Sequence, residues 1–144
     1  TRKERAILAH HTAAGYVLIS YYLQDAHALA AEVARDHHER KDGSGYPRGI
    51  HLLDLMVEII ATCDMYDALI SPRPYRPVSY PNRTALEELT GMAEGNKIGW
   101  EVVKALISHN RRSKSDYRGT TVSVEKRGTA PLDNLYGVVG EEDT

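Results

Sequence analysis

The sequence predicts an all-α domain, a bundle of about five helices followed by a short β-prone tail. Three observations predict it: apolar residues recur at helical spacing, glycines and prolines separate these segments, and a β-type alternation lies near the C-terminus, in Thr120–Val124. A chain of 144 residues suits one main domain with one core. We expect a helical domain over residues 1–112 and an extension over residues 113–144 that forms a strand or hairpin.

The first two helices are predicted over residues 2–23 and 26–38. The first carries a broad apolar face, which His10 and His11 interrupt midway. Asp25 is a candidate N-cap for the second helix, which is rich in alanine. Because no glycine or proline stands between the two segments, we expect a short connection and antiparallel packing.

Three further helices are predicted over residues 55–69, 82–93 (or from 79) and 99–110, after a glycine-rich loop over residues 39–53. Asp54 is a candidate N-cap for the first of these, whose apolar positions indicate burial on more than one side. The residues expected to face inward are Met56, Ile59, Ile60, Cys63, Ala68, Ala85, Leu86, Leu89, Met92, Trp100, Val103, Leu106 and Ile107.

Composition excludes several classes of protein. The net charge of -2 gives no case for binding a nucleic-acid polymer or an anionic membrane. The single cysteine, Cys63, excludes an internal disulfide and suits a reducing compartment. No apolar run approaches the roughly 18 residues needed to span a bilayer. We therefore expect a cytoplasmic protein without a membrane span.

Histidine and aspartate side chains from three predicted helices are candidate metal ligands. They are His11 in the first helix, His37 and His38 at the end of the second, and Asp64 in the third. Imidazole together with carboxylate suits Zn, Mn, Fe or Ni rather than Ca or Mg. Asp64 stands among apolar residues, where a free carboxylate carries a large desolvation cost that a metal or an arginine would offset.

Each candidate ligand also has an ordinary explanation. A lone histidine on a helix is more often a core or surface residue than a ligand, which leaves both interpretations of His11 open. Asp64 is a surface residue if its helix is less buried than expected. Asp42, in the segment DGSG, is interpreted as a turn residue. The histidines assigned to no site are His10, His27, His51 and His109.

The loop after the third predicted helix carries two arginines, Arg73 and Arg76, between three prolines. Guanidinium groups on a stiff loop suit phosphate oxygens, which they bind in bidentate fashion. Tyr75 between them can stack on a base, and Asp67 shares a helix face with Asp64. The alternative is a solvated loop with surface arginines. A metal centre beside such arginines points to phosphoester hydrolysis.

Two linked segments, HHERKDGSGYPRG and CDMYDALISPRPYRP, resemble the HD-GYP family of bacterial signalling phosphodiesterases, with a match over about residues 3–110. The resemblance implies an HD-domain helical bundle with a bi- or trinuclear metal centre, commonly iron or manganese; zinc is the remaining candidate. It also implies hydrolysis of cyclic di-GMP, or sometimes of cyclic GMP-AMP, in bacterial signal transduction.

Matching positions imply roles for single residues. The implied metal ligands are His11, His37, His38 and Asp64, of which Asp64 and His38 are also the candidate catalytic residues. The implied substrate-binding residues are Tyr46, Asp67, Arg73 and Arg76. In the family, the Gly45–Tyr46–Pro47 loop is linked to substrate binding and to partner contacts, so we expect a protein partner there and leave a homodimer open.

The chain departs from the family pattern at several positions. It contains no His-Asp doublet (a histidine followed directly by an aspartate), Thr12 replaces a proline, and Glu58 stands where an arginine is usual. Either the chain is a fragment whose missing N-terminal helices carry the pair, or it is a degenerate member. We expect a partial site with weak or no catalysis, and we leave open whether this chain binds a metal. The alternative function is a catalytically silent module that binds a nucleotide or a partner protein.

Overall fold

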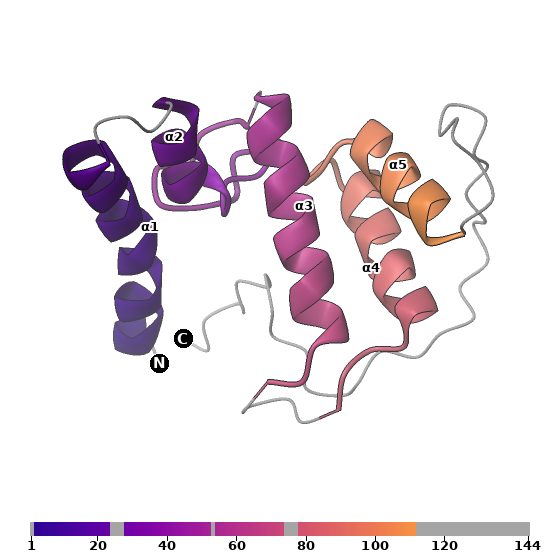
Figure 1. Ribbon diagram of the computed structural model, residues 1–144. Coiled ribbons are helices and arrows are strands. Elements are labelled where there is room, and N and C mark those ends of the chain that lie inside the picture. Colours follow the sequence, from indigo (N-terminus) through magenta and orange to yellow (C-terminus); the bar gives the residue numbers. More distant parts are fainter. Residues whose placement is uncertain (1, 24–27, 53, 74–77, 112–144) are drawn as a thin grey trace.

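The computed structural model describes residues 2–23, 28–52, 54–73 and 78–111, which contain five helices (Figure 1). The prediction of an all-α fold is confirmed. Thr120–Val124, Tyr75 and Arg76 lie outside the described residues. No described helix is long and apolar enough to cross a membrane. The helices are α1 (Arg2–Tyr22), α2 (Ala28–Asp36), α3 (Leu55–Ile70), α4 (Asn82–Glu94) and α5 (Trp100–Asn110).

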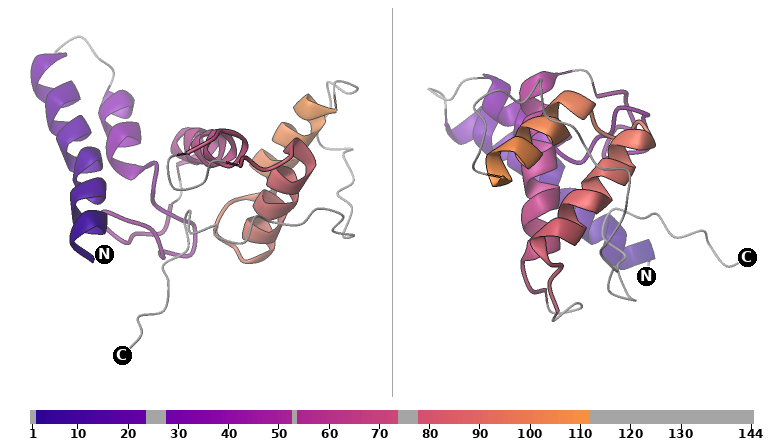
Figure 2. Two further views of the ribbon diagram at one scale, coloured as in Figure 1. Left: turned by 90° about the horizontal axis from the view of Figure 1, so that it is seen from below. Right: turned by 90° about the vertical axis from the view of Figure 1, so that its right-hand side faces the viewer.

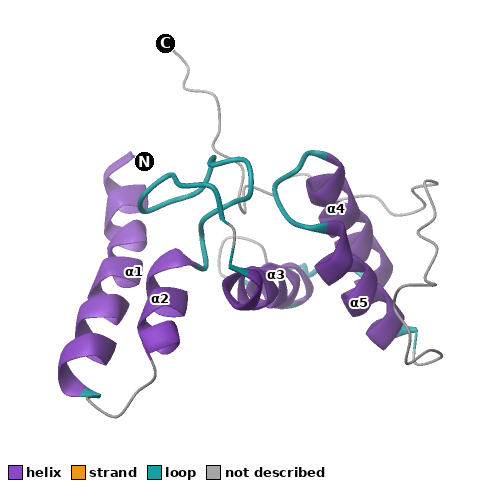
Figure 3. Ribbon diagram, turned by 90° about the horizontal axis from the view of Figure 1, so that it is seen from above, coloured by secondary structure: helices purple, strands orange, loops and turns teal. Residues whose placement is uncertain are grey.

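The helices form two groups on either side of α3. Figure 2 shows α1 and α2 side by side and antiparallel, with α4 and α5 beyond α3. Among the helices, α1 contacts α2 alone, whereas α3 contacts α2, α4 and α5. The long loop between α2 and α3 lies across one end of the bundle (Figure 3). The predicted antiparallel packing of the first two helices is therefore confirmed.

The apolar core lies in the α3–α5 group. Its buried members come from these helices and their connections, and Ile70, Leu86, Met92 and Leu106 pack against it. The inward positions predicted for α4 are thus confirmed. Trp100 is 37% exposed, so its prediction was wrong; it is the first residue of α5, where fewer neighbours cover a side chain. The core residues are Met65, Leu69, Tyr80, Ala85, Leu89, Ala93, Ile98, Val103 and Ile107.

Helix α3 is buried along one stripe only. The prediction that it is buried on more than one side was therefore wrong. Asp54 caps it as predicted, since its carboxylate accepts the N–H groups of Met56 (2.8 Å) and Val57 (3.0 Å). The exposed apolar side chains of this helix are Leu55, Met56, Ile59, Ile60 and Cys63. The buried stripe comprises Val57, Glu58, Ala61, Thr62, Met65, Ala68 and Leu69.

Helix α2 ends earlier than predicted. Its last residue is Asp36, so His37 and His38 occupy the turn that follows rather than the helix itself. The amide of His37 still donates to the carbonyl of Val33 (3.1 Å), and that of Glu39 donates to the carbonyl of Asp36 (2.8 Å). This tight turn places the two imidazoles beside each other, with ring centroids 4.2 Å apart.

Candidate metal centre

Three histidines from two segments meet beside the end of α2. They are His11, from the middle of α1, and His37 and His38. One ring nitrogen from each lies within 4.8 Å of the other two. The antiparallel α1–α2 packing brings them together across 26 residues of sequence. Three of the four predicted ligands therefore converge.

Hydrogen bonds fix which nitrogen of two of these rings is available. The Nδ1 atoms of His11 and His37 lie 2.5 Å and 3.0 Å from the carbonyl oxygens of Leu8 and Val33. Each Nδ1 therefore carries the proton, as in many metal-ligating histidines. The two Nε2 lone pairs are left facing one another at 3.3 Å. Two bare lone pairs repel at this distance, and a shared proton or cation removes the repulsion.

The separation of these nitrogens suits a transition metal. Two imidazoles at 2.0–2.1 Å on adjacent corners of a tetrahedron stand about 3.3–3.4 Å apart. The observed Nε2–Nε2 distance of 3.3 Å matches this value. The donor set also suits a first-row transition metal such as Zn, Fe or Ni rather than Mg or Ca, because all three ligands are imidazoles. The residues present therefore fit a metal.

His38 is held neutral by its surroundings. Burial lowers its pKa from 6.5 to about 3, and the charges of His37, Arg40 and His11 act in the same direction. A neutral imidazole keeps a lone pair for a metal. The ring of Tyr46 stacks on it, with centroids 4.6 Å apart and planes inclined by 23°. Burial raises the pKa of Tyr46 by more than the charge of Arg40 lowers it, and the charge of Asp64 adds to the rise, so its phenol stays a donor.

The loop after the histidines is built against their backbone. The amide of Tyr46 donates to the carbonyl of His38 (3.2 Å). A methyl group at Gly45 would overlap the backbone of His38, Glu39 and Arg40, so only glycine fits there. Asp42 is a turn residue as predicted, because its carboxylate accepts the amide (3.0 Å) and hydroxyl (2.7 Å) of Ser44.

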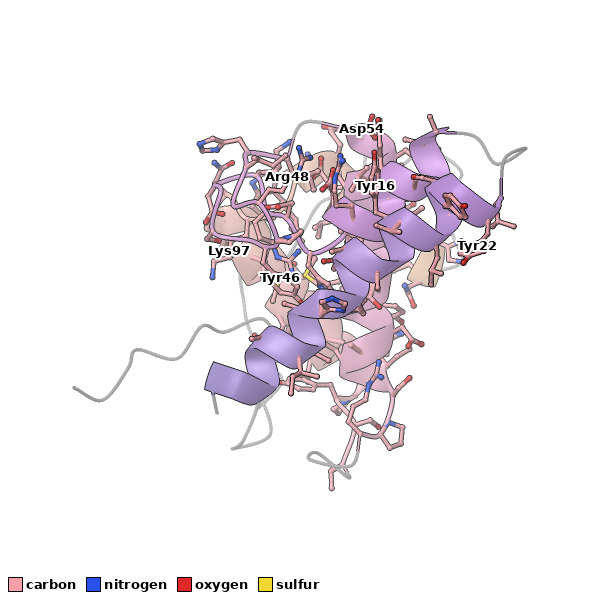
Figure 4. The ribbon with its side chains drawn as sticks, turned by 90° about the vertical axis from the view of Figure 1, so that its left-hand side faces the viewer. Tyr16, Tyr22, Tyr46, Arg48, Asp54 and Lys97 are labelled. Carbon is pink, nitrogen blue, oxygen red and sulfur yellow. The ribbon has the colours of Figure 1, made fainter. Side chains whose placement is uncertain are left out.

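Two buried carboxylates, which sequence reasoning left without a role, flank the histidine pair. Asp36 precedes it and accepts two hydrogen bonds from the Arg48 guanidinium, at 2.6 Å and 3.2 Å. Burial raises the pKa of Asp36, but hydrogen bonds from Arg35 and Arg48 outweigh this effect and hold it below its usual range. Glu39 follows the pair and is fully buried. Figure 4, viewed from the α1 side, labels Tyr46 and Arg48 on the loop that these carboxylates hold.

The remaining predicted site residues lie on or after α3. Asp64 is half-buried and lies near enough to Tyr46 to raise its pKa, but it is not part of the group of three histidines. Asp67 is exposed and pairs with Arg73 over 3.6 Å. The hydroxyl of Ser71 donates to the same carboxylate (3.3 Å). The structure thus places Asp67 and Arg73 together on one side of the end of α3.

The model of the HD domain family matches residues 1–102. The chain belongs to this family. Its curated relatives include a cyclic di-GMP phosphodiesterase of Thermotoga maritima, 35% identical over 120 residues, which are 82% of this chain and 32% of the relative. A cyclic di-GMP phosphodiesterase response regulator of Xanthomonas campestris is 40% identical over 78 residues, 53% of this chain and 21% of the relative. The expected HD-GYP assignment of this HD domain is confirmed.

Some relatives are named for a different cyclic dinucleotide. A 3'3'-cGAMP-specific phosphodiesterase of Vibrio cholerae is 43% identical over 74 residues, 50% of this chain and 15% of the relative. The chain spans about a third or less of the length of these curated relatives. No solved structure matches the chain.

Proposed function

We propose that this HD domain is the metal-binding part of a phosphodiesterase acting on a cyclic dinucleotide, cyclic di-GMP or 3'3'-cGAMP, in bacterial signalling. The convergence of His11, His37 and His38 is the observation that carries the proposal. The substrates printed in the names of its relatives support the choice of substrate class.

The three histidines would hold a divalent iron, manganese or zinc ion, with Asp64 as the fourth candidate ligand. Such an ion supplies Lewis acidity and lowers the pKa of water. Three protein nitrogens leave coordination positions open, as in catalytic rather than structural sites. The hydrogen bonds at Nδ1 of His11 and His37 keep both rings aimed inward before the ion arrives.

Arg73 would bind a phosphate of the substrate. Its pair with Asp67 is long (3.6 Å), and the Asp67 side chain is 67% exposed, so the pair contributes at most about 1 kcal/mol. A phosphate group offers the guanidinium two oxygens in bidentate geometry and can displace the carboxylate. Tyr46 would orient the substrate through its neutral phenol, beside His38, on which its ring stacks.

A binding module without catalysis is the second candidate. The observation favouring it is that no histidine in this sequence is followed directly by an aspartate, as in the family's His-Asp doublet. Such a module would bind metal or nucleotide, or a partner protein through Gly45–Tyr46–Pro47, without hydrolysing the nucleotide. A protein partner at that loop, a homodimer and a cytoplasmic location stay predictions.

The test combines metal analysis with hydrolysis. The purified chain is loaded anaerobically with Fe²⁺, Mn²⁺ or Zn²⁺, its bound metal is measured by mass spectrometry, and the loss of cyclic di-GMP and 3'3'-cGAMP is followed by chromatography. We expect bound metal, and substantial loss of it in His11→Ala and His38→Ala. Hydrolysis by the loaded protein supports the enzyme, whereas metal binding without hydrolysis supports the silent module.

His10→Ala is the matched control, because His10 is the exposed neighbour of His11 on α1 and lies outside the histidine group. It should retain the metal content of the unsubstituted chain. Equal loss of metal in His10→Ala and His11→Ala would contradict the proposed ligand set. A chain that binds no metal under any condition would refute the metal-dependent function.

A further inference from the structure

The geometry points to Glu39 as a positioning residue of the metal centre: its carboxylate locks the loop of residues 45–50 against His38 and so sets the orientation of that imidazole. This inference rests on the proposed function, since it concerns the same metal-binding histidines. It assigns a role to Glu39, a buried charged residue that belongs neither to the histidine group nor to the proposed substrate-binding loop after α3.

The Glu39 carboxylate is saturated by backbone donors from one short segment. Its Oε1 atom accepts the amides of Arg48 (2.6 Å) and Gly49 (3.1 Å), and its Oε2 atom accepts the amide of Ile50 (3.1 Å). The residue is fully buried. A buried carboxylate is costly unless hydrogen bonds compensate it, and here all three compensating donors belong to the loop. The carboxylate and the loop conformation therefore require each other.

The same loop presses on His38 at two points. Gly45 packs directly on the backbone of His38 and Glu39, and the amide of Tyr46 binds the carbonyl of His38. The Tyr46 ring then lies almost parallel to the His38 imidazole, at 23°. If the amides of residues 48–50 no longer donate to Glu39, the chain that follows Tyr46 is no longer held in place. The Tyr46 ring that stacks on His38 then loses its fixed position.

Glu39 acts through the loop rather than as a ligand. Its carboxylate oxygens do not join the group of ring nitrogens from His11, His37 and His38, and both oxygens already accept backbone amides. Residues that orient metal ligands in this indirect way commonly change metal affinity 10–100-fold when substituted. Glu39 would act on the ion by the same route, through the ring on His38.

The experiment uses Co²⁺ as the probe, because its visible absorption reports the geometry of its ligands. Titration of the full chain and of Glu39→Gln gives a dissociation constant and a spectrum for each. Glutamine keeps the volume but replaces one acceptor oxygen by a donor, so at least one of the three amides is released. We expect Co²⁺ binding weakened about 10–100-fold, with a changed spectrum.

Glu58→Gln is the matched control. Glu58 is also a buried glutamate that accepts a backbone amide, that of Gly99, and it pairs with Lys41 at 3.3 Å. The Glu58→Gln variant should lower stability, and we expect the same of Glu39→Gln. Glu58→Gln should nevertheless leave the Co²⁺ dissociation constant within about twofold and the spectrum unchanged. Equal spectral changes in both variants would mean that Glu39 has only a general structural role, and would overturn the inference.

Tyr46→Leu keeps the test decisive if Glu39→Gln does not fold. It removes the ring stacked on His38 and leaves the three bonds of Glu39 in place. A changed Co²⁺ spectrum supports the route through His38, and an unchanged one overturns it. If the unsubstituted chain binds no Co²⁺, the proposed function fails as well; if it binds and Glu39→Gln matches it in both measurements, the inference alone fails.

Discussion

The two sides of α3 are stabilised by different means. On the α4–α5 side, apolar residues such as Leu89 and Val103 are fully buried in one core. On the α1–α2 side, the buried side chains are mostly polar, and α1 exposes most of its large apolar residues. The buried polar residues of that side are Thr12, Asp36, Glu39 and Arg40. The exposed apolar residues of α1 and its end are Ile7, Leu8, Val17, Leu18, Tyr21, Tyr22 and Leu23.

The contrast separates a scaffold from a site. Burial of apolar surface is non-directional and fixes α3, α4 and α5 relative to each other. Hydrogen bonds and ion pairs are directional, and here they hold the histidines and their loop at defined angles. The α1–α2 side therefore has a defined arrangement of polar side chains but little stabilisation from apolar burial. We expect it to depend more than the other side on what binds at the histidines.

The largest expected effect is on the core. Leu89→Ala should lower the free energy of unfolding by about 2–5 kcal/mol, because a fully buried leucine leaves a cavity when truncated. Leu18→Ala on α1, where the side chain is 54% exposed, should cost less than about 0.5 kcal/mol. Urea unfolding followed by circular dichroism measures both. Similar losses would show that the α1 surface is covered in solution and would break the comparison.

Metal should stabilise one side selectively. At a free metal concentration 100 times the dissociation constant, opening of the α1–α2 side should become harder by about 2.7 kcal/mol. Hydrogen exchange measured with and without Zn²⁺ or Mn²⁺ should show new protection in α1 and in residues 28–40. Amides of α4 and α5 should change little, since local opening is independent there. Uniform protection would mean that the two sides unfold together.

Acid should weaken the metal-free site at moderate pH. His38 in the folded chain has a pKa of about 3, so between pH 6.5 and 3 the unfolded chain binds a proton that the folded chain does not. Stability therefore falls as the pH drops through this window, by less than about 1.4 kcal/mol per unit from this group. The depressed pKa of Asp36 acts only below about pH 4, because its stabilisation is complete above the unfolded value of 3.8.

Urea unfolding in a chelator at pH 7, 6 and 5 tests this dependence. His38→Gln removes the titrating group and should flatten the stability profile over that range. His51→Gln, an exposed histidine of the same loop, should leave the slope in place. A slope that survives in His38→Gln would assign the pH dependence to other groups.

The smallest expected effect on stability is at the end of α3. Arg73→Ala should change the free energy of unfolding by less than about 0.5 kcal/mol, because its pair with Asp67 is long and exposed. The same substitution should weaken binding of cyclic di-GMP, measured by calorimetry, while the metal content stays unchanged. Arg83→Ala is the control, since Arg83 pairs with Glu87 on α4. If Arg73→Ala also loses metal, Arg73 supports the metal centre rather than the substrate.

Much of the fold was predictable because its signals are local. Helical spacing, the Asp54 cap and the breaks at glycine and proline each act within a few residues, and all five helices follow from them. The meeting of His11 with the His37–His38 pair was predictable for a related reason. A short connection makes α1 and α2 antiparallel, and the family motif marks all three positions.

The exposure of one side of α3 was not predictable. Apolar residues at Met56, Ile59 and Ile60 indicate that burial is favourable, but not that a neighbouring helix is present to bury them. Glu39 was missed although a signal existed. A loop with several glycines has backbone amides without partners, and an acidic residue directly before it can accept them.

The single buried stripe of α3 also fixes how the helix is rotated about its own axis. Met65 and Leu69 anchor the helix to the core, while Asp64 and Asp67 lie on other faces of the same turns. One residue corresponds to about 100° of rotation in a helix. A core substitution that rotated α3 by even a fraction of that angle would move the Asp64 carboxylate relative to Tyr46, whose pKa its charge raises. The apolar packing on one side of α3 therefore sets the position of a carboxylate on the polar side.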